Sequence, residues 1–280
     1  WRGILMTDNE VERHYSQGDL YRGITDALAA AGVDLANLEP EELDPVEHFH
    51  GRGLAATADL AASLAPAPEH EILDIGSGIG GPARYFARTY GCRMVGIDLT
   101  AEFCDVARRL NAAVGLADKI SIEWGSATDL PFADGRFDAA YSQNVSMNIA
   151  DKTTLFGEAY RVLRPGGSFA LSELALGDGG EVIYPAPWSS DGVHSHLLSE
   201  QQTVDALRGA GFDVVSIQDN SDAVRQFFEE QKEAVRRDGP PKLGNFILMG
   251  DNAKEKARNA ARNQMEGRTR PIEILCRRGL

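Results

Sequence analysis

Short apolar runs recur along most of the chain and alternate with longer segments whose apolar residues recur every three or four positions. Runs of about five or six mostly apolar residues predict buried strands, and the longer spacing predicts amphipathic helices. Strands that alternate with helices favour a parallel sheet covered by helices on both faces. We therefore predict a doubly wound α/β fold with a seven-stranded, mostly parallel sheet. The predicted strands are residues 71–75, 93–98, 120–124, 137–142, 168–172, 212–217 and 272–276.

Predicted helices connect most of these strands, near residues 82–90, 101–114, 152–163 and 199–210. Two stretches lie outside the alternation, and we interpret residues 173–198 and 220–270 as insertions over the ligand-binding end of the sheet. The first part of the chain has a helical pattern and then an acidic linker with two prolines, residues 39–45. We therefore expect an N-terminal helical cap, residues 1–53, followed by one main domain, residues 54–280.

The charge balance argues against nucleic acid as a partner. The 280 residues include 28 Lys and Arg against 42 Asp and Glu, a net charge of −14, whereas nucleic-acid binding depends mainly on Lys and Arg. No apolar stretch reaches the roughly 18 residues that a membrane-spanning helix needs, so we expect no membrane partner. The three cysteines are odd in number and far apart, which favours neither a disulfide framework nor a zinc site. We predict a cytoplasmic protein whose natural start is Met6.

The first predicted strand ends in a glycine-rich turn with an acid just before it. Glycine lets the backbone approach a ligand closely, because no Cβ stands in the way. Gly76, Gly78 and Gly81 satisfy the dinucleotide pattern GxGxxG, and Asp98 follows at about the distance of its ribose-binding acid. An NAD-dependent oxidoreductase is therefore one hypothesis. Asp74, however, lies two residues before Gly76 and would repel a pyrophosphate. It favours a cationic ligand such as S-adenosylmethionine, which carries a sulfonium and an ammonium but no phosphate.

Three further segments follow the glycine turn in order, and with it they resemble the class I S-adenosylmethionine-dependent methyltransferases over roughly residues 54–219. The resemblance implies a Rossmann-like fold, S-adenosylmethionine as the cofactor and methyl transfer as the reaction. Within the last segment, residues 164–167 are typical of a turn between a helix and a strand. The matching segments are residues 74–80 (DIGSGIG), 96–98 (GID), 130–138 (LPFADGRFD) and 161–167 (RVLRPGG).

The resemblance also implies which residues bind the cofactor. In this family the glycine turn takes the methionine part, the acid that ends the second strand holds the ribose, and the loop after the third strand binds adenine. Many relatives have Asp where this chain has Ser126, whose hydroxyl accepts a hydrogen bond less strongly than a carboxylate. The implied cofactor-binding residues are Asp74, Gly76, Ser77, Gly78, Asp98, Leu99, Ser126, Ala127 and Gln143.

Three other segments, residues 49–53, 143–152 and 263–268, resemble a bacterial branch that includes sarcosine and dimethylglycine N-methyltransferases, with phosphoethanolamine methyltransferases more distant. This narrower resemblance implies a small-molecule acceptor, such as the nitrogen of a small amine or amino acid. Relatives often carry His where this chain has Asn144. An O- or C-methyltransferase of specialised metabolism, and a binding module that performs no transfer, stay open as alternatives. The oligomeric state also stays open, with a homodimer as one alternative.

The need to remove a proton decides which side chains are catalytic candidates. A neutral tertiary amine needs no base, whereas a phenol or an acidic carbon must lose a proton to a group such as His or Tyr. We take Tyr15, His50 and His194 as candidates, against the alternatives that His50 caps a helix and that Tyr15 only packs. His194 and His196 make no metal site by themselves, because no further ligands converge with them in the sequence, and we predict no metal.

Aromatic residues and prolines alternate in the first insertion, around Tyr184 and Trp188. Such a segment gives a stiff apolar wall, and its ring faces would attract a methylated ammonium. The alternative is that Trp188 only anchors the loop to the core. The expected substrate-binding residues are Asn144, Asn148, Tyr184, Trp188 and His194.

Overall fold

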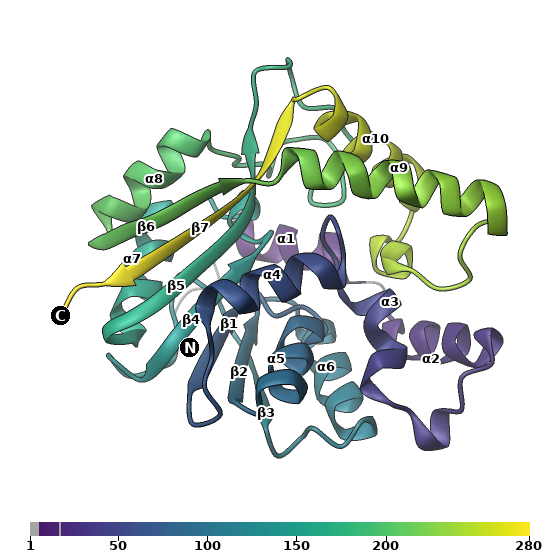
Figure 1. The fold of residues 1–280 in the computed structure, drawn as a ribbon, viewed down its shortest axis with the longest axis horizontal. Coiled ribbons are helices and arrows are strands. Elements are labelled where there is room, and N and C mark those ends of the chain that lie inside the picture. Colours follow the sequence, from purple (N-terminus) through teal and green to yellow (C-terminus); the bar gives the residue numbers. More distant parts are fainter. Residues whose placement is uncertain (1–5, 17) are drawn as a thin grey trace.

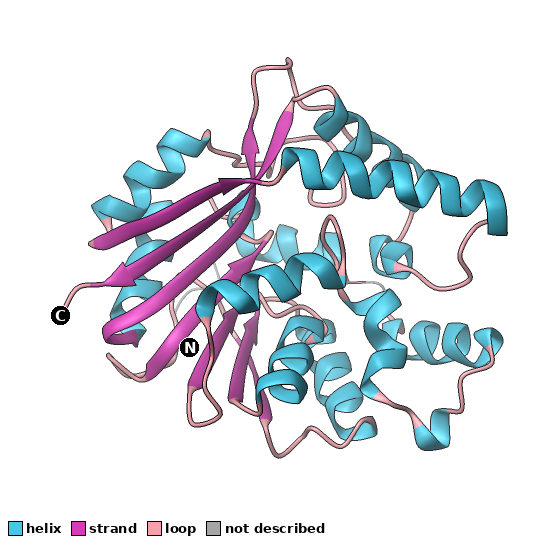
Figure 2. Cartoon of the chain, in the orientation of Figure 1, coloured by secondary structure: helices cyan, strands magenta, loops and turns pink. Residues whose placement is uncertain are grey.

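The computed structural model describes residues 6–16 and 18–280. The strands in these residues form one seven-stranded sheet in the order β3-β2-β1-β4-β5-β7-β6, and helices lie on both of its faces (Figure 1, Figure 2). The predicted α/β fold is confirmed. The strands are β1 (Glu71–Ile75), β2 (Arg93–Asp98), β3 (Ile120–Trp124), β4 (Phe137–Gln143), β5 (Leu163–Leu176), β6 (Phe212–Asp219) and β7 (Thr269–Arg278).

The sheet is parallel from β3 to β5 and has two antiparallel pairings, which β7 makes with β5 and with β6. Because β1 lies between β2 and β4, the carboxyl ends of these three strands meet at the point where the strand order reverses. In open α/β sheets, ligands bind at this point.

The prediction was wrong about the length of β5. This strand spans Leu163–Leu176 rather than residues 168–172, because its antiparallel pairing with β7 continues as far as Leu176 and Thr269. Residues 173–176, expected in the first insertion, are therefore strand. Residues 164–167, expected as a turn, also lie within β5, beside an irregularity in its pairing with β4, and Gly166 has a φ of 79° there.

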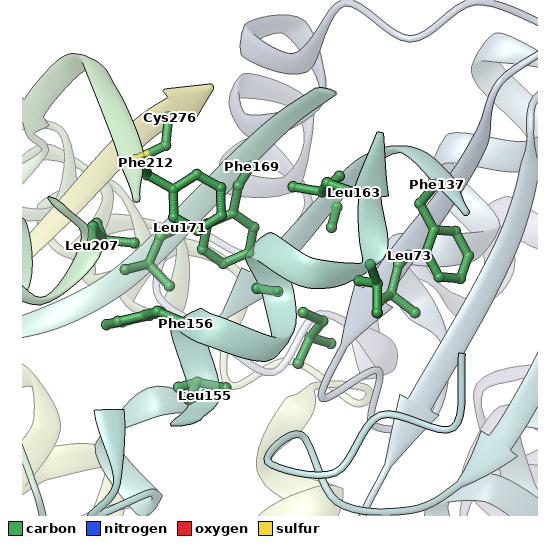
Figure 3. Packing of buried hydrophobic residues seen from close by; sticks show 14 of the residues in the cluster. Leu73, Phe137, Leu155, Phe156, Leu163, Phe169, Leu171, Leu207, Phe212 and Cys276 are labelled. Atoms are coloured by element: carbon green, nitrogen blue, oxygen red, sulfur yellow. The ribbon is translucent and has the colours of Figure 1, made fainter. Parts of the chain in front are cut away.

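Alternate residues of the strands point to opposite faces of the sheet. Leu73 and Ile75 of β1 pack in one core cluster with the helices α7 (Lys152–Val162) and α8 (Glu200–Gly209). Ile72 packs in a second cluster with α4 (Leu54–Leu64) and α5 (Gly81–Tyr90). Figure 3 shows part of the first cluster, in which Phe169 and Phe212 stack with their ring centroids 5.3 Å apart. The helices that cover the sheet are α4 (Leu54–Leu64), α5 (Gly81–Tyr90), α6 (Ala101–Ala113), α7 (Lys152–Val162) and α8 (Glu200–Gly209).

A third apolar cluster joins the N-terminal segment to the glycine turn. Leu28 and Leu43 pack there with Ile79, which lies in the turn itself, and with Leu248 from the second insertion. The elements outside the covered sheet are α1 (Met6–Tyr15), α2 (Leu20–Ala31), η1 (Leu35–Asn37), η2 (Pro40–Leu43), α3 (Asp44–Glu47), η3 (Ser146–Asn148), α9 (Ser221–Asp238), η4 (Asn245–Met249) and α10 (Ala253–Met265). The division of the chain at residue 53 stays a prediction.

A buried ion pair also connects the N-terminal segment to the glycine turn. Arg84 of α5 and Glu47 of α3 are both fully buried as side chains, and Arg84 Nη2 lies 2.7 Å from Glu47 Oε2. The same guanidinium donates to the carbonyl of Ile79 in the glycine turn. The N-terminal segment is therefore held against the turn by both apolar packing and charge.

Within residues 6–16 and 18–280, the structure has no helix that combines the length and the apolar character needed to cross a membrane. The cysteines are free and buried.

Candidate active site

The glycine turn between β1 and α5 is shaped by two different constraints. Gly76 and Gly78 have φ values of 79° and 53°, a region that side chains with a Cβ rarely adopt. A Cβ on Gly76 would lie 2.2 Å from Val145 Cγ2, whereas a Cβ on Gly78 would meet no described atom within 4 Å. Gly76 is therefore needed for packing, and Gly78 borders open space.

That open space belongs to a cavity at the carboxyl ends of β1, β2, β3 and β4, which we call the inner cavity. All nine predicted cofactor-binding residues line it: Asp74, Gly76, Ser77, Gly78, Asp98, Leu99, Ser126, Ala127 and Gln143. The wall is completed by the N-terminal segment, through Tyr15, Phe49 and His50, and by Leu248 of the second insertion. Among the described side chains that line the inner cavity, none is a lysine or an arginine.

Asp98 connects the end of β2 to the glycine turn. Its Oδ2 accepts a hydrogen bond from the Gly78 N–H, and its Oδ1 accepts one from the Thr100 N–H, each at 2.8 Å. Burial raises the pKa of this carboxyl, and the two backbone hydrogen bonds oppose the shift. Each carboxylate oxygen has a second lone pair, so Asp98 still has capacity for the hydroxyl groups of a ribose.

The inner cavity contains buried polar atoms that make no hydrogen bond to a described residue. They belong to Asp74, Ser77 and Gln143. Asp74 Oδ2, Ser77 Oγ and Gln143 Nε2 are buried and have no hydrogen-bond partner among the described residues. Asp74 is 2% exposed. Burial and the nearby Asp98 raise its pKa to about 7, and the nearby Tyr141 hydroxyl opposes the shift. Buried polar atoms are usually paired, so this set indicates a polar ligand.

The inner cavity is also lined by Tyr15 and by the two predicted asparagines, Asn144 and Asn148. Tyr15 Oη donates to Asn148 Oδ1 at 3.1 Å, and Asn148 Nδ2 donates to the Trp188 carbonyl at 2.8 Å. Asn144 lines the same cavity and has a φ of 55°. Burial raises the pKa of Tyr15, with smaller contributions from Asp98 and Glu173. Tyr15 is therefore a neutral hydrogen-bond donor at physiological pH.

A second cavity, which we call the outer cavity, adjoins the first at Asn148. Its lining consists of Glu10, Arg13, His14, Asn148, Trp188, Ser189, Ser190, Asp191 and His194. The structure thus places Trp188 and His194 in the outer cavity, separate from the inner candidates Tyr15 and His50. His194 Nε2 forms an ion-pair contact of 3.2 Å with Glu10 Oε2. Tyr184 lines neither cavity and instead packs against Trp188 and Gly192.

The sequence prediction missed two groups of buried polar residues beside the site. Glu173 accepts hydrogen bonds from the N–H groups of Val145 and Ser146, at 3.0 and 2.9 Å, and so fixes the segment after β4. Thr57 contacts both His50 and Gln143, at 3.2 and 3.4 Å. An acid at the carboxyl end of a predicted strand was a usable signal for Glu173, whereas nothing in the local sequence singles out Thr57.

Comparisons with known proteins fit this geometry. Residues 73–171 match a family model described as a methyltransferase domain. The chain is 31% identical to the O-methyltransferase resE of Aspergillus sclerotiorum, over 69% of this chain and 73% of that protein. This chain belongs to the S-adenosylmethionine-dependent methyltransferases.

Two further similarities extend over most of the methyltransferase. It is 28% identical to a sarcosine/dimethylglycine N-methyltransferase of Halorhodospira halochloris, over 76% of each chain. Its fold matches the geranyl diphosphate C-methyltransferase of Streptomyces coelicolor with a TM-score of 0.71, at 18% identity, over 99% of this chain and 100% of that one. The names of these three proteins include methylation at oxygen, nitrogen and carbon.

The inner cavity fits the methyl donor of this family, S-adenosylmethionine. Asp74 Oδ2 has no hydrogen-bond partner among the described residues, which suits a cationic ligand, and Gly78 leaves open space at the turn. The dinucleotide hypothesis loses support, because a pyrophosphate would meet Asp74 and no arginine or lysine among the described residues of the cavity wall.

Proposed function

We propose that this methyltransferase acts on the nitrogen of a small amine or amino acid, such as sarcosine or dimethylglycine. The observation that carries the proposal is the charge of the inner cavity, whose described lining includes Asp74 and Asp98 but neither lysine nor arginine. Such a cavity favours ligands that carry positive charge over ligands that carry phosphate. The N-methyltransferase relative supports the same class of acceptor.

S-adenosylmethionine bound in the inner cavity supplies a methyl group that is already activated by the sulfonium. We propose that Asp74 pairs with the ammonium of this cofactor, that Asp98 accepts hydrogen bonds from the ribose and that Ser126 contacts the adenine. The apolar side chains of Phe103 and Ile149 exclude water from the cavity. The main contribution of the protein is then to position and desolvate the reacting groups.

The outer cavity supports an acceptor that has a carboxylate. Arg13 and Trp188 line this cavity together, and Asn148 borders both cavities. A guanidinium binds a carboxylate through two parallel hydrogen bonds, and an indole ring attracts a methylated ammonium. We propose that the carboxylate of the acceptor lies toward Arg13 and its nitrogen toward Tyr15 and Asn148.

Methylation of a hydroxyl group is the second candidate, because one relative is an O-methyltransferase. A hydroxyl must lose its proton, and neither inner candidate is a strong base at neutral pH. Burial lowers the pKa of His50 to about 3, and Tyr15 holds its proton tightly because burial raises its pKa. A small amine reacts through its neutral form, which it reaches by losing a proton to water before it binds. The protein then needs no base of its own for nitrogen, so this comparison favours nitrogen over oxygen.

Transfer of a labelled methyl group tests the proposal. The purified enzyme is given S-adenosylmethionine and, separately, sarcosine, dimethylglycine, phosphoethanolamine and a simple phenol. We expect turnover with sarcosine or dimethylglycine, and a raised KM for that acceptor with little change in kcat in Arg13→Gln. Asp98→Ala serves as the cofactor-binding control. Transfer only to the phenol would establish the second candidate, and cofactor binding without transfer to any acceptor would support a binding module.

The remaining expectations belong to the same proposal. We propose a cytoplasmic enzyme whose partners are the cofactor and a small acceptor, with neither nucleic acid nor membrane involved. The net charge of −14 supports this view.

A further inference from the structure

The sheet places one aromatic hydroxyl beside Asp74. In the parallel pairing of β1 with β4, the register partner of Asp74 is Tyr141. Register partners on neighbouring strands point to the same face of a sheet. On the β2 side the register partner of Asp74 is Gly96, which has no side chain, and a Cβ there would lie 2.7 Å from Ser77 Oγ. Of the two register partners of Asp74, Tyr141 alone therefore presents a side chain to it.

The ring of Tyr141 is packed in apolar surroundings. Its side chain is fully buried in the second core cluster, and its ring stacks on that of Phe86 with the centroids 4.7 Å apart. Neither Tyr141 Oη nor Asp74 Oδ2 has a hydrogen-bond partner among the described residues. A buried hydroxyl without a partner costs free energy, which a phenyl ring at the same place does not. This cost indicates that the hydroxyl does more than pack.

The charges nearby identify Asp74 as the acceptor for this hydroxyl. Burial and the Asp74 carboxyl raise the pKa of Tyr141 well above its usual value, with a smaller contribution from Cys92, so the phenol keeps its proton. The Tyr141 hydroxyl in turn lowers the pKa of Asp74, against burial and Asp98. Their placement falls short of a full hydrogen bond. The terminal torsion of an Asp side chain is soft, however, so a small rotation changes which oxygen faces the hydroxyl.

We propose that Tyr141 is a positioning residue for cofactor binding, whose hydroxyl donates to one carboxylate oxygen of Asp74 and holds the other toward the ammonium of S-adenosylmethionine. Tyr141 is not part of the lining of the inner cavity, so it acts through Asp74 without touching the cofactor. A donor to the carboxylate favours its ionised form, which is the form that attracts a cation. The inference rests on the proposed pairing of Asp74 with the ammonium, and the experiment separates the two claims.

The other titratable side chains of the inner cavity have their own constraints. Among the described lining residues they are Tyr15, Glu47, His50 and Asp98. Burial raises the pKa of Tyr15 and lowers that of His50 to about 3, so both stay neutral at physiological pH. Glu47 is paired with Arg84. Burial raises the pKa of Asp98, and its titration is common to the wild type and to any Tyr141 variant.

Tyr141→Phe removes the hydroxyl and keeps the ring. The affinity for S-adenosylhomocysteine, which has the same ammonium, is measured by calorimetry at about pH 6, 7 and 8, after circular dichroism has shown that the variant folds. If the substitution raises the pKa of Asp74 from about 7 by about one unit, binding weakens about 10-fold at pH 6 and about 2-fold at pH 8. Tyr160→Phe is the control, because Tyr160 packs against the core cluster on the opposite face of the sheet and should leave the affinity unchanged.

The same substitution in the Asp74→Asn background distinguishes positioning from packing. Without the carboxylate, Tyr141→Phe should change the affinity by no more than about 2-fold at any pH. A loss of equal size at every pH, or an undiminished loss in the Asp74→Asn background, overturns the proposal. If Asp74→Asn weakens binding but Tyr141→Phe does not, the pairing of Asp74 with the ammonium stands and the role of Tyr141 is wrong. If Asp74→Asn by itself leaves the affinity unchanged, the proposed pairing is wrong.

Discussion

At the scale of single residues, we propose that Asp74 and the glycine turn decide which ligand the inner cavity accepts. Asp74 has a buried carboxylate oxygen without a partner among the described residues, beside a turn whose backbone is open at Gly78. A buried charge is costly unless a partner satisfies it. The carboxylate therefore favours a ligand that brings a positive charge into the cavity.

The affinity for the cofactor should depend on pH through Asp74. Burial raises the pKa of Asp74 to about 7, and a cationic ligand prefers the ionised form, so binding should tighten as the pH rises from about 6 to 8. Asp74→Asn should weaken binding by roughly 10- to 100-fold at the upper end of this range and remove this part of the pH dependence. Calorimetry with S-adenosylhomocysteine at three pH values measures both effects. Parallel profiles for wild type and variant would contradict the assignment, because titration of the ligand is common to both.

The raised pKa of Asp74 also makes the stability of the fold depend on pH. The folded pKa of Asp74 lies above the value of about 3.9 for an unfolded Asp, so the unfolded state releases its proton first. The contribution of this group to the free energy of unfolding is therefore largest below about pH 4 and is lost as the pH rises toward 7. The free energy of unfolding of Asp74→Asn, compared with that of the wild type, should therefore be higher at neutral pH than at acid pH. Urea unfolding of both chains at the two pH values measures this difference.

Gly76 and Gly78 should respond differently to alanine. Gly76→Ala combines a backbone strain with a clash against Val145, and we expect a loss of about 2–5 kcal/mol in the free energy of unfolding. Gly78→Ala has only the strain, about 1–2 kcal/mol, but its methyl group points into open space at the inner cavity and should weaken cofactor binding. Urea unfolding and calorimetry of both variants separate the two effects. Equal stability losses would contradict the packing role of Val145.

At the scale of elements, the segment after β4, residues 144–149, forms one side of the inner cavity. Charged side chains of β5 and α7 form hydrogen bonds with its backbone. Glu173 of β5 accepts the N–H groups of Val145 and Ser146. Lys152 of α7 donates to the carbonyl of His196 at 2.9 Å and also contacts the carbonyl groups of Ser146 and Ile149. Two charged side chains thus connect the segment after β4 to the sheet and to the first insertion.

Substitutions at Glu173 should show how much this connection contributes to the free energy of unfolding. Glu173→Leu leaves two buried N–H groups unpaired and Lys152 without its neighbouring negative charge, so we expect a loss of about 3–5 kcal/mol in the free energy of unfolding. Glu173→Gln keeps an acceptor oxygen and should cost clearly less. Urea unfolding at pH 7 measures both variants. A Glu173→Gln variant as unstable as Glu173→Leu would show that the charge matters more than the two hydrogen bonds.

At the scale of the whole molecule, the inner cavity joins parts of the chain that are far apart in sequence. Its lining extends from Tyr15 to Leu248, and the third apolar cluster links the same N-terminal and C-terminal segments. A ligand in this cavity contacts the sheet and both segments at once. Binding is therefore coupled to the stability of the complete fold.

Cofactor binding should raise the melting temperature of the whole chain in one transition. A ligand at 100 times its Kd stabilises the folded state by about 2.7 kcal/mol, which corresponds to roughly 5–10 °C for a chain of this size. Thermal unfolding with and without S-adenosylhomocysteine measures the shift, and Asp98→Ala should abolish it. Two separate transitions, with only one shifted by the ligand, would indicate that the N-terminal segment does not take part in binding.

The local sequence determined most of the covered sheet and nine of the residues that line the inner cavity. Strands β1, β2 and β3 have the predicted bounds, because short apolar runs between polar segments report burial directly. The nine implied cofactor residues lie in contiguous motifs at the ends of adjacent strands, and the topology of the sheet brings those ends together. The prediction that Asp74 pairs with a cation rests on its place before Gly76.

Only the tertiary structure decided the length of β5, the second cavity and the surroundings of His50. β5 is extended by pairing with β7, which lies about a hundred residues later in the chain, so no local pattern reports it. The three candidates Tyr15, His50 and His194 look alike in the sequence, yet His194 lies in a different cavity from the other two. His50 contacts Thr57, which also contacts His48 and Gln143. Hydrogen bonds between distant segments depend on distances that a linear pattern of polar and apolar residues does not contain.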